Sequence, residues 1–404
     1  MAIIVQKFGG SSLQSPERIK KVAARARSEK EKGNDVVVVV SAMGDQTNEL
    51  MRLCQEVNPS SCGREKDLLL STGEQVSSAL MALALQELGV GSVAMTGQEA
   101  GIETEYVHGN AKIKAVHTRN IQEVLDEGKI AVVAGFQGCA ANGEICTLGR
   151  GGSDTTAAAL AAALKADRCE IFTDVDGVYT ADPRIISGAR KIHSMDYDQM
   201  QTMAEMGAGV IHPRAVRHAQ KHNIPLVVRS SFTLEEGTVI HDCKGSGGGS
   251  PAIGMTYEKN LCLLRLNTEA DNGDLFHWLD EFLTVGTSFG WSGKDETFLA
   301  IRADHLDRVM STLKEHTVSL GIKEAEQTYG WAAIHFVFAG REEKRKRVSS
   351  IKERISDRWG EVLTMDGHPS VWSLLVPEEK SVKFSQNLYD WVIGSGVPAL
   401  AFGS

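Results

Sequence analysis

The segment Asp35-Val36-Val37-Val38-Val39-Val40 decides how the first half of this chain folds. Five consecutive valines leave no polar face, so they predict a strand covered on both sides, as in a parallel sheet between layers of helices. Similar β-rich runs lie at residues 2–6, 92–96, 130–134, 170–173 and 224–228. Because these runs alternate with longer helical stretches, we expect an α/β domain with right-handed crossover connections.

The stretches between the strands carry signals for helix starts. Ser15-Pro16-Glu17 supplies a cap, a proline at the first helical position and an early acid. A second helix is expected at about residues 73–88 and an alanine-rich third at residues 155–166, with Ser153 or Asp154 as the N-cap of the third.

The second half of the chain follows a segment rich in glycine and serine. Residues 244–252 have the composition of a flexible linker, so the first domain is expected at residues 1–243. Two shorter rounds of strands and helices follow, at residues 253–330 and 331–404, and each resembles a small ferredoxin-like βαββαβ module. The predicted fold class is α/β, a three-layer sandwich with a mostly parallel sheet followed by two such modules.

Composition narrows the class of protein. The 404 residues include 43 Lys and Arg against 52 Asp and Glu, giving a net charge of −9, and 42% are hydrophobic. This profile excludes disorder as the main state and argues against a surface dominated by nucleic-acid binding. We find no run of 18 or more apolar residues, so no membrane association is expected. The seven cysteines lack C-x-x-C spacing and suggest neither a disulfide framework nor a zinc site, which indicates a cytoplasmic chain.

A glycine-rich turn follows the first predicted strand, in Lys7-Phe8-Gly9-Gly10-Ser11-Ser12. Two glycines allow backbone N–H groups to approach phosphate oxygens, and the lysine offers a positive charge to a phosphoryl group in transfer. A plain Gly-Gly turn between a strand and a helix is the alternative. No Walker sequence occurs in the chain, which disfavours a P-loop NTPase.

A second glycine-rich loop, at residues 147–154, runs into the alanine-rich helix. The N-terminus of a helix favours an anion, and Arg150 can clamp a carboxylate with two parallel hydrogen bonds. A capped helix with an incidental arginine is the alternative. Asp154 at the end of the loop can instead hold Lys7 in position across the cleft.

A polar loop at residues 173–184 starts at the end of a predicted strand. Its Asp-x-Asp-Gly sequence is unsuited to calcium, because Gly177 in sixth place would put Phe172 and Pro183 at the first and twelfth ligand positions. We expect the loop to enclose a nucleotide at the carboxyl edge of the sheet, where open α/β sheets bind ligands. An ordinary turn after the strand is the alternative.

Three further polar residues lie near strand or helix ends. Ser41 ends the valine strand and Thr47 lies in the polar turn after it. Glu74 follows Gly73 and, from the residues alone, reads as an acid in the first turn of a helix.

Together these motifs resemble the aspartate kinase family of the amino acid kinase superfamily, and they occur in the family's order. Glu74 in its segment and Arg150 in Gly-Arg-Gly-Gly-Ser-Asp point to aspartate among the substrates of the superfamily. The matching segments are Lys7-Phe8-Gly9-Gly10-Ser11-Ser12, Val39-Val40-Ser41-Ala42-Met43-Gly44 with Thr47-Asn48, Leu70-Ser71-Thr72-Gly73-Glu74, Gly135-Phe136-Gln137-Gly138, the loop at residues 149–154 and the loop at residues 172–184.

The resemblance implies phosphoryl transfer from ATP to the side-chain carboxylate of L-aspartate, giving 4-phospho-L-aspartate, the first step towards lysine, threonine, methionine and diaminopimelate. Lys7 would neutralise the developing charge and Asp154 would orient it. Mg²⁺ would be held mainly by ATP phosphates, with no dedicated protein ligand. The implied ATP-binding residues are Lys7, Phe8, Gly9, Gly10, Ser41, Thr173, Asp174, Tyr179, Asp182 and Arg184, and the implied aspartate-binding residues are Thr47, Glu74, Arg150, Gly151, Gly152 and Ser153.

The resemblance also concerns regulation. The two C-terminal modules occupy the place of the family's paired ACT domains, which implies feedback by an amino-acid effector in a homodimer or higher oligomer. One departure is Gly209, where the family commonly has a nucleotide-contacting lysine, a role that Arg214 could take over. Two alternatives to an active aspartate kinase are therefore retained: a catalytically weak regulatory subunit that senses an amino acid, and a kinase for another acidic metabolite.

Overall fold

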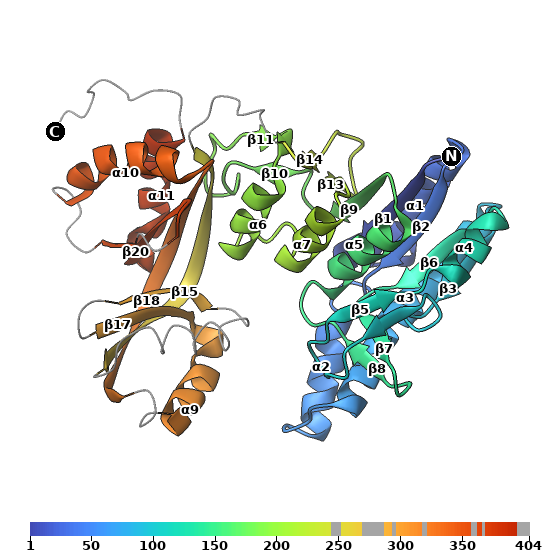
Figure 1. Ribbon diagram of the computed structural model, residues 1–404, viewed down its shortest axis with the longest axis horizontal. Helices are drawn as coiled ribbons and strands as arrows, with labels where there is room; N and C mark the ends of the chain where they lie inside the picture. Colours follow the sequence, from blue (N-terminus) through green and yellow to red (C-terminus); the bar gives the residue numbers. More distant parts are fainter. Residues whose placement is uncertain are drawn as a thin grey trace. The chain divides into compact units, whose positions relative to one another are not determined.

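The computed structural model describes residues 1–243, 252–268, 287–292, 296–316, 321–356, 362–365 and 368–393. Two compact units are present (Figure 1). The first unit comprises Met1–Val178, Lys191–Ala204 and Gly209–Gly245, and the second comprises Tyr179–Arg190, Glu205–Ala208 and Ser246–Ser404. The chain thus crosses between the units more often than the single break predicted near residue 250.

An eight-stranded sheet forms the centre of the first unit, in the order β12-β14-β13-β9-β1-β2-β6-β3. The strand β2 (Asp35–Val40) pairs in parallel with β1 (Ile3–Phe8) and β6 (Ile130–Ala134), and all five of its valines are fully buried. The predicted parallel sheet around the valine strand is therefore confirmed. The other strands are β9 (Arg168–Thr173), β3 (Ser92–Met95), β13 (Leu226–Ser230), β14 (Thr238–Ile240) and β12 (Ser194–Met195).

Helices cover both faces of this sheet (Figure 1). The helices α1 (Pro16–Glu31) and α3 (Arg64–Glu87) share one core with Val36, Val38 and Val40. The helix α5 (Gly152–Leu164) packs against β1, β2 and β9. Because alternate valines point to opposite faces, both layers of helices take part in burying β2.

The start of α1 agrees with the prediction from the sequence, whereas the starts of two other helices differ. Ser15 Oγ accepts a hydrogen bond from the backbone N–H of Arg18 at 3.4 Å, as the predicted cap requires. The N-cap of α5 is Gly151, in a left-handed conformation with φ of 65°, so Ser153 and Asp154 lie inside the first turn and the predicted cap is wrong.

The helix α3 begins nine residues before the predicted start, at Arg64, so Glu74 lies in its middle and is not a first-turn acid. By length and composition alone α3 could cross a membrane, but 56% of its most apolar window is buried within the protein. It contacts β3 and β6 as a core helix does. Smaller elements of this unit are η1 (Gly10–Leu13), α2 (Gln46–Val57), β4 (Ile102–Thr104), β5 (Ile113–Val116), α4 (Arg119–Asp126), β7 (Gln137–Ala140), β8 (Ile145–Thr147), α6 (Tyr197–Glu205) and α7 (Pro213–Lys221).

The second unit contains a six-stranded antiparallel sheet, β16-β17-β15-β18-β20-β19. Its two long strands, β15 (Ala252–Thr268) and β18 (Ile322–Phe338), each serve both predicted modules. The first half of β15 pairs with the end of β18, and its second half pairs with β17 (Glu296–Arg302) and with the start of β18. The expected module boundary at residues 330 and 331 therefore lies inside β18, and the first half of β15 belongs with the second module.

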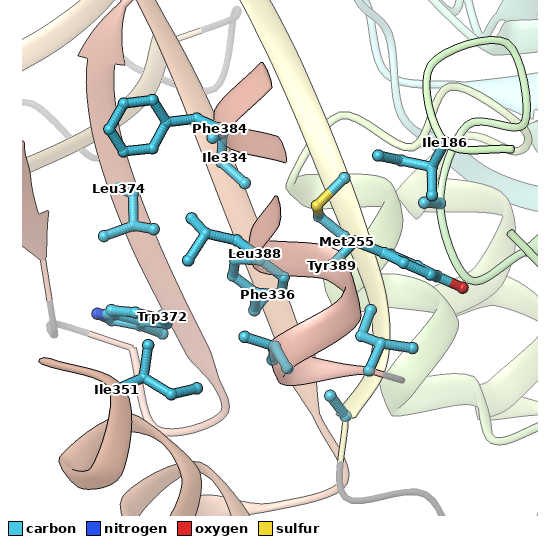
Figure 2. Packing of buried hydrophobic residues seen from close by; sticks show 14 of the residues in the cluster. Ile186, Met255, Ile334, Phe336, Ile351, Trp372, Leu374, Phe384, Leu388 and Tyr389 are labelled. Atoms are coloured by element: carbon cyan, nitrogen blue, oxygen red, sulfur yellow. The ribbon is translucent and has the colours of Figure 1, made fainter. Parts of the chain in front are cut away.

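The core of the second unit packs beneath α11 (Glu378–Val392), around Phe336 and Trp372 (Figure 2). Ala181 and Ile186, from the segment Tyr179–Arg190, belong to the same core. The remaining elements are β16 (Thr287–Ser292), α9 (Leu306–His316), α10 (Arg341–Ser356), β19 (Leu363–Met365) and β20 (Val371–Pro377). Of the predicted linker at residues 244–252, residues 244–251 lie outside the described residues.

Candidate active site

Lys7 and Asp154 form an ion pair at the carboxyl edge of the central sheet. Lys7 Nζ lies 2.7 Å from Asp154 Oδ1, and both side chains are 12% exposed. The other carboxylate oxygen, Oδ2, accepts a hydrogen bond from the backbone N–H of His212 at 3.3 Å. The contact expected from the sequence between the two loops is thus present, and it fixes the direction of the lysine ammonium.

The glycine turn after β1 packs its backbone closely against the backbone at the ends of the neighbouring strands β9 and β2. The N–H of Gly9 donates to Phe172 O, at the end of β9, at 3.2 Å. A Cβ on Gly10 would lie 2.9 Å from both Ala42 O and Gly44 O, in the loop after β2. This approach requires glycine, because no real side chain tolerates such contacts. The turns that follow three neighbouring strands are therefore held together at one edge.

Glu74 projects a buried carboxylate towards the same edge. The side chain is 2% exposed, and Oε1 accepts a hydrogen bond from the backbone N–H of Ala42 at 3.1 Å. Oε2 is buried and has no hydrogen-bond partner among the described residues. Burial raises the pKa of Glu74 to about 7, against the lowering effect of the Ala42 N–H. Such a group is suited to a cationic ligand, which would restore the lost solvation of the carboxylate.

The loop before α5 combines two glycines with an exposed arginine. Gly149 and Gly151 have φ of 74° and 65°, and a Cβ on Gly151 would collide with the ring of His212. Arg150 lies between them, is exposed, and makes no hydrogen bond or ion pair with the described residues. Its guanidinium is therefore available to an anionic group from outside the chain.

The rest of this loop packs close to the ends of β2 and β6. The N–H of Gly135 donates to Val40 O at 3.0 Å, and a Cβ on Gly135 would lie 2.9 Å from Ser153 Oγ. Gly152 and Ser153 are buried, whereas Thr47 is half-buried in the first turn of α2. The structure thus places Glu74 and Ser153 near the ends of β2 and β6, and all the predicted aspartate-binding residues belong to the first unit.

The predicted nucleotide residues are divided between the two units. Thr173, which ends β9, donates to Asp174 Oδ1 at 2.9 Å in the first unit. Tyr179, Asp182 and Arg184 belong to the second unit. Arg184 forms an ion pair with Asp182 at 2.7 Å, and its hydrogen bonds lower the pKa of the Asp182 carboxyl. The role of these residues towards a nucleotide stays a prediction.

His212 and Arg214 take positions that the sequence did not predict. Burial and the charge of Arg214 lower the pKa of His212, whose ring caps α7 by accepting from the Arg214 N–H at 3.3 Å. Arg214 donates to Leu148 O at 2.9 Å and to Asn110 Oδ1 at 2.6 Å. Arg214 thus braces the glycine loop, and its replacement of the lysine absent at Gly209 stays a prediction. The pair His212-Pro213, a cap followed by proline, was the available sequence signal for α7.

Comparison with known proteins gives a consistent result. The model of the amino acid kinase family matches residues 2–230. An aspartokinase of Bacillus sp. (strain MGA3) is 45% identical over 348 residues, covering 84% of this chain and 85% of that protein. An aspartokinase of Geobacillus stearothermophilus is 57% identical over 242 residues, which span 60% of this chain and 60% of that protein.

Solved structures of E. coli aspartokinase III share the fold. The complex with aspartate and ADP, in the R-state, has a TM-score of 0.79 at 24% identity, and the complex with lysine and aspartate, in the T-state, has a TM-score of 0.72 at 23% identity. Each covers 96% of this chain and 99% of the solved chain. The predicted fold class is confirmed, and the antiparallel sheet of the second unit is consistent with ACT-like modules. The chain belongs to the amino acid kinase family and, within it, to the aspartate kinases.

Proposed function

We propose that this chain transfers the γ-phosphoryl group of ATP to the side-chain carboxylate of L-aspartate, giving 4-phospho-L-aspartate and ADP. The observation that carries the proposal is the buried, unpartnered Oε2 of Glu74 in the same unit as the exposed Arg150, unpaired among the described residues. An α-amino acid presents an ammonium group to the first and a carboxylate to the second. Glu74 contacts the loop after β2, and Ser153, in the loop that carries Arg150, packs at the end of that strand.

Catalysis would rest on positioning and electrostatics. The substrate carboxylate is itself the nucleophile, so no covalent enzyme intermediate is needed. Lys7 would neutralise the charge that develops on the phosphoryl group, and Asp154 would keep its ammonium oriented through their 2.7 Å contact. Gly9 would let phosphate oxygens approach this ammonium, because it has no side chain and a Cβ there would lie 3.5 Å from Lys7 Nζ. Thr47 and Ser153 would assist in binding aspartate.

Mg²⁺ would be held mainly by ATP phosphates and water. Among the described residues, the one cluster of three or more possible ligands is Asp67, His108 and Cys146, and none of these belongs to the glycine turn or to the Lys7–Asp154 pair. A glycine turn without carboxylate ligands of its own fits a phosphate-bound ion, because Mg²⁺ commonly keeps several waters. When bound, Mg²⁺ supplies charge neutralisation on the phosphates.

The second unit would regulate the reaction. One solved structure of E. coli aspartokinase III is a complex with lysine and aspartate, in the T-state. We extend this to an amino-acid effector of the present chain, such as lysine, threonine or diaminopimelate, acting in a cytoplasmic homodimer or higher oligomer. The place in metabolism would be the first step of the biosynthesis of these amino acids.

A hydroxylamine trap of the acyl phosphate tests the activity. Purified protein with Mg-ATP and aspartate should give aspartyl hydroxamate, and a Lys7→Ala variant should give none above background. If wild-type protein yields no more than this control but binds lysine or threonine, the chain is a regulatory subunit and not an active kinase. If glutamate reacts better than aspartate, the substrate assignment is wrong.

A further inference from the structure

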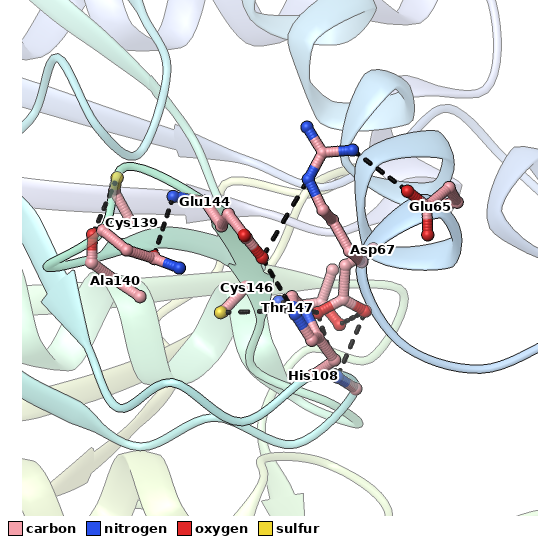
Figure 3. Close-up of polar contacts among 11 residues, drawn as sticks. Glu65, Asp67, His108, Cys139, Ala140, Glu144, Cys146 and Thr147 are labelled. Atoms are coloured by element: carbon pink, nitrogen blue, oxygen red, sulfur yellow. Dashed lines mark hydrogen bonds and ion pairs between the residues drawn. The ribbon is translucent and has the colours of Figure 1, made fainter.

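Asp67, His108 and Cys146 form a cluster of possible metal ligands that includes neither Lys7 nor Asp154 (Figure 3). Asp67 comes from the first turn of α3, His108 from the loop between β4 and β5, and Cys146 from β8. The three ligand atoms lie within 4.8 Å of one another. His108 Nδ1 is 3.2 Å from Asp67 Oδ2 and 3.8 Å from Cys146 Sγ. The fold thus brings a carboxylate, an imidazole and a thiol from three distant segments to one point.

The other ring nitrogen of His108 faces a second carboxylate. Nε2 lies 3.4 Å from Glu144 Oε2, and both atoms are buried without a hydrogen-bond partner in the described residues. A histidine that binds a metal through one nitrogen almost always presents the other to a carboxylate, carbonyl or water, which orients the ring. Glu144 therefore occupies the position of an orienting partner for a histidine that ligates through Nδ1.

Asp67 is held in place before any ligand arrives. Its carboxylate is 1% exposed and accepts hydrogen bonds from the backbone N–H groups of Gly109 and Thr147, and from Thr147 Oγ1 at 2.8 Å. The local charge is negative, because two carboxylates lie beside the ring and, among the described residues, Arg64 is the one other cation paired with either of them, with Nε 4.0 Å from Glu144 Oε2. A buried, pre-positioned and anionic group of ligands favours a cation.

We propose that Asp67, His108 and Cys146 form a binding site for a thiophilic divalent cation, best matched by Zn²⁺. Oxygen, nitrogen and sulfur donors together are typical of zinc and unsuited to Mg²⁺. Tetrahedral zinc with ordinary bond lengths separates its ligand atoms by about 3.3–3.6 Å. The observed spacing of up to 4.8 Å therefore requires the side chains to close in by at most about 1.3 Å, and a water would complete the fourth position.

Zinc bound at Asp67, His108 and Cys146 would restrain the loop at residues 147–154, which carries Arg150. Asp67 bonds both Thr147 N and Thr147 Oγ1, and Thr147 is the first residue of that loop. A metal bridging α3, the loop at His108 and β8 would cross-link the base of the loop to the helix that carries Glu74. We therefore expect bound zinc to raise the melting temperature, since a ligand that binds only the folded state stabilises it.

Cobalt substitution gives a readout that does not depend on catalysis. Metal-free full-length protein titrated with Co²⁺ should develop a thiolate-to-cobalt charge-transfer band in the near ultraviolet, saturating at one ion per chain, and Zn²⁺ should displace it. Cys146→Ser should remove the band. The matched control is Cys139→Ser, because Cys139 lies on the neighbouring strand β7 and its thiol donates to the carbonyl of Ala140. This variant should keep the band.

A second variant separates ligand loss from misfolding. Glu144→Gln keeps the three ligands and the size of the side chain, so it should fold and bind zinc about 10- to 100-fold more weakly, as expected for loss of an orienting carboxylate. A wild-type chain without a band would overturn the proposal. So would a band abolished by Cys243→Ser but not by Cys146→Ser, because Cys243 Sγ lies 3.4 Å from His241 Nε2 and offers a competing two-ligand site.

Discussion

At the scale of single residues, Glu74 links stability to pH. Its pKa is raised from 4.5 to about 7 in the folded protein, so the folded state binds an extra proton between these values. Its stabilising contribution is therefore present at low pH and lost as the pH rises through 7. Glu74→Gln should raise the free energy of unfolding at pH 8 by up to about 3 kcal/mol, since 2.5 pKa units correspond to this energy, and should leave it unchanged near pH 4.

Urea unfolding at the two pH values measures this difference, and isothermal titration should show that the same variant no longer binds aspartate. Glu29 is a control of opposite sign. Although burial opposes it, hydrogen bonds from Lys32 and Asn34 lower the pKa of Glu29, so Glu29→Gln should destabilise the protein at pH 8. If Glu74→Gln is less stable than wild type at pH 8, burial of the ionised Glu74 carboxylate does not destabilise the folded protein, and the prediction is wrong.

The Lys7–Asp154 pair is the second feature at this scale. Asp154→Asn removes the charge that orients the ammonium, so we expect kcat to fall about 10²- to 10³-fold, the loss seen when one preorganised electrostatic partner is removed. The control is Asp35→Asn, which breaks the similarly exposed pair of Lys30 and Asp35 at 2.9 Å. Steady-state kinetics of both variants should show the loss only for Asp154. Equal effects would indicate that the pair contributes only to stability.

At the scale of secondary-structure elements, the turn after β1 depends on one of its two glycines more than on the other. A Cβ on Gly10 meets two carbonyl oxygens at 2.9 Å, whereas one on Gly9 meets its nearest atoms at 3.5 and 3.7 Å, ordinary contact distances. Gly10→Ala should therefore lower the free energy of unfolding by about 1–3 kcal/mol, as overpacking does. Gly9→Ala should leave it within about 0.5 kcal/mol of wild type. Chemical denaturation of the two variants checks the contrast.

The predictable and unpredictable helix starts differ in their physical basis. The start of α1 follows from the local signals of Ser15 and Pro16, which act within one turn. The start of α5 is set by Gly151 in a left-handed conformation, against the ring of His212, 61 residues further along the chain. No local pattern contains that contact. The helix α3 follows Gly63, which has a φ of 87°. The acidic residues Glu65 and Asp67 in its first turn are the local sequence signal for this start.

The site was predictable to a similar extent. Glycine-rich motifs next to helix starts identified Lys7, Arg150 and Asp154, because Lys7 lies near the carboxyl end of β1 and the other two lie at the N-terminus of α5. His212 could not be assigned, since its backbone N–H reaches Asp154 across 58 residues. The cluster at Asp67, His108 and Cys146 could not be predicted, because sequence spacing indicates metal ligands only when they are close along the chain.

At the scale of the whole molecule, the predicted nucleotide loop is shared between the units. Tyr389, on α11, bonds Thr180 Oγ1 at 2.6 Å and donates to Gly188 O at 3.1 Å, which ties the segment Tyr179–Arg190 to the second unit. Tyr389→Phe removes both bonds without changing the packing of the ring. We expect the KM for ATP to rise several-fold, with kcat and the KM for aspartate little changed.

Tyr329→Phe is the matched control, because Tyr329 is 63% exposed and its hydroxyl donates to Gln327 on the same strand. Initial-rate kinetics with ATP varied at saturating aspartate should separate the two tyrosines. A normal KM for ATP in Tyr389→Phe would show that the second unit does not set the position of this loop. A rise confined to the KM for aspartate would argue for a substrate role instead.

The first half of β15 pairs with the end of β18, so we expect that the first C-terminal module can be deleted without loss of the second. Asn260 and Gly330 both have positive φ, 57° and 81°, and Glu258 pairs with Ala333 just outside them. Deleting residues 261–329 would join Asn260 directly to Gly330 within a short connection between Glu258 and Ala333, and asparagine and glycine are favoured at the positive φ that hairpin turns require. The shortened chain should still fold, with a cooperative melting transition, whereas truncation after residue 330 would leave the first half of β15 without its partner strand. Along the chain, the first module is therefore inserted between the two paired half-strands of the second module, at residues 252–258 and 333–338.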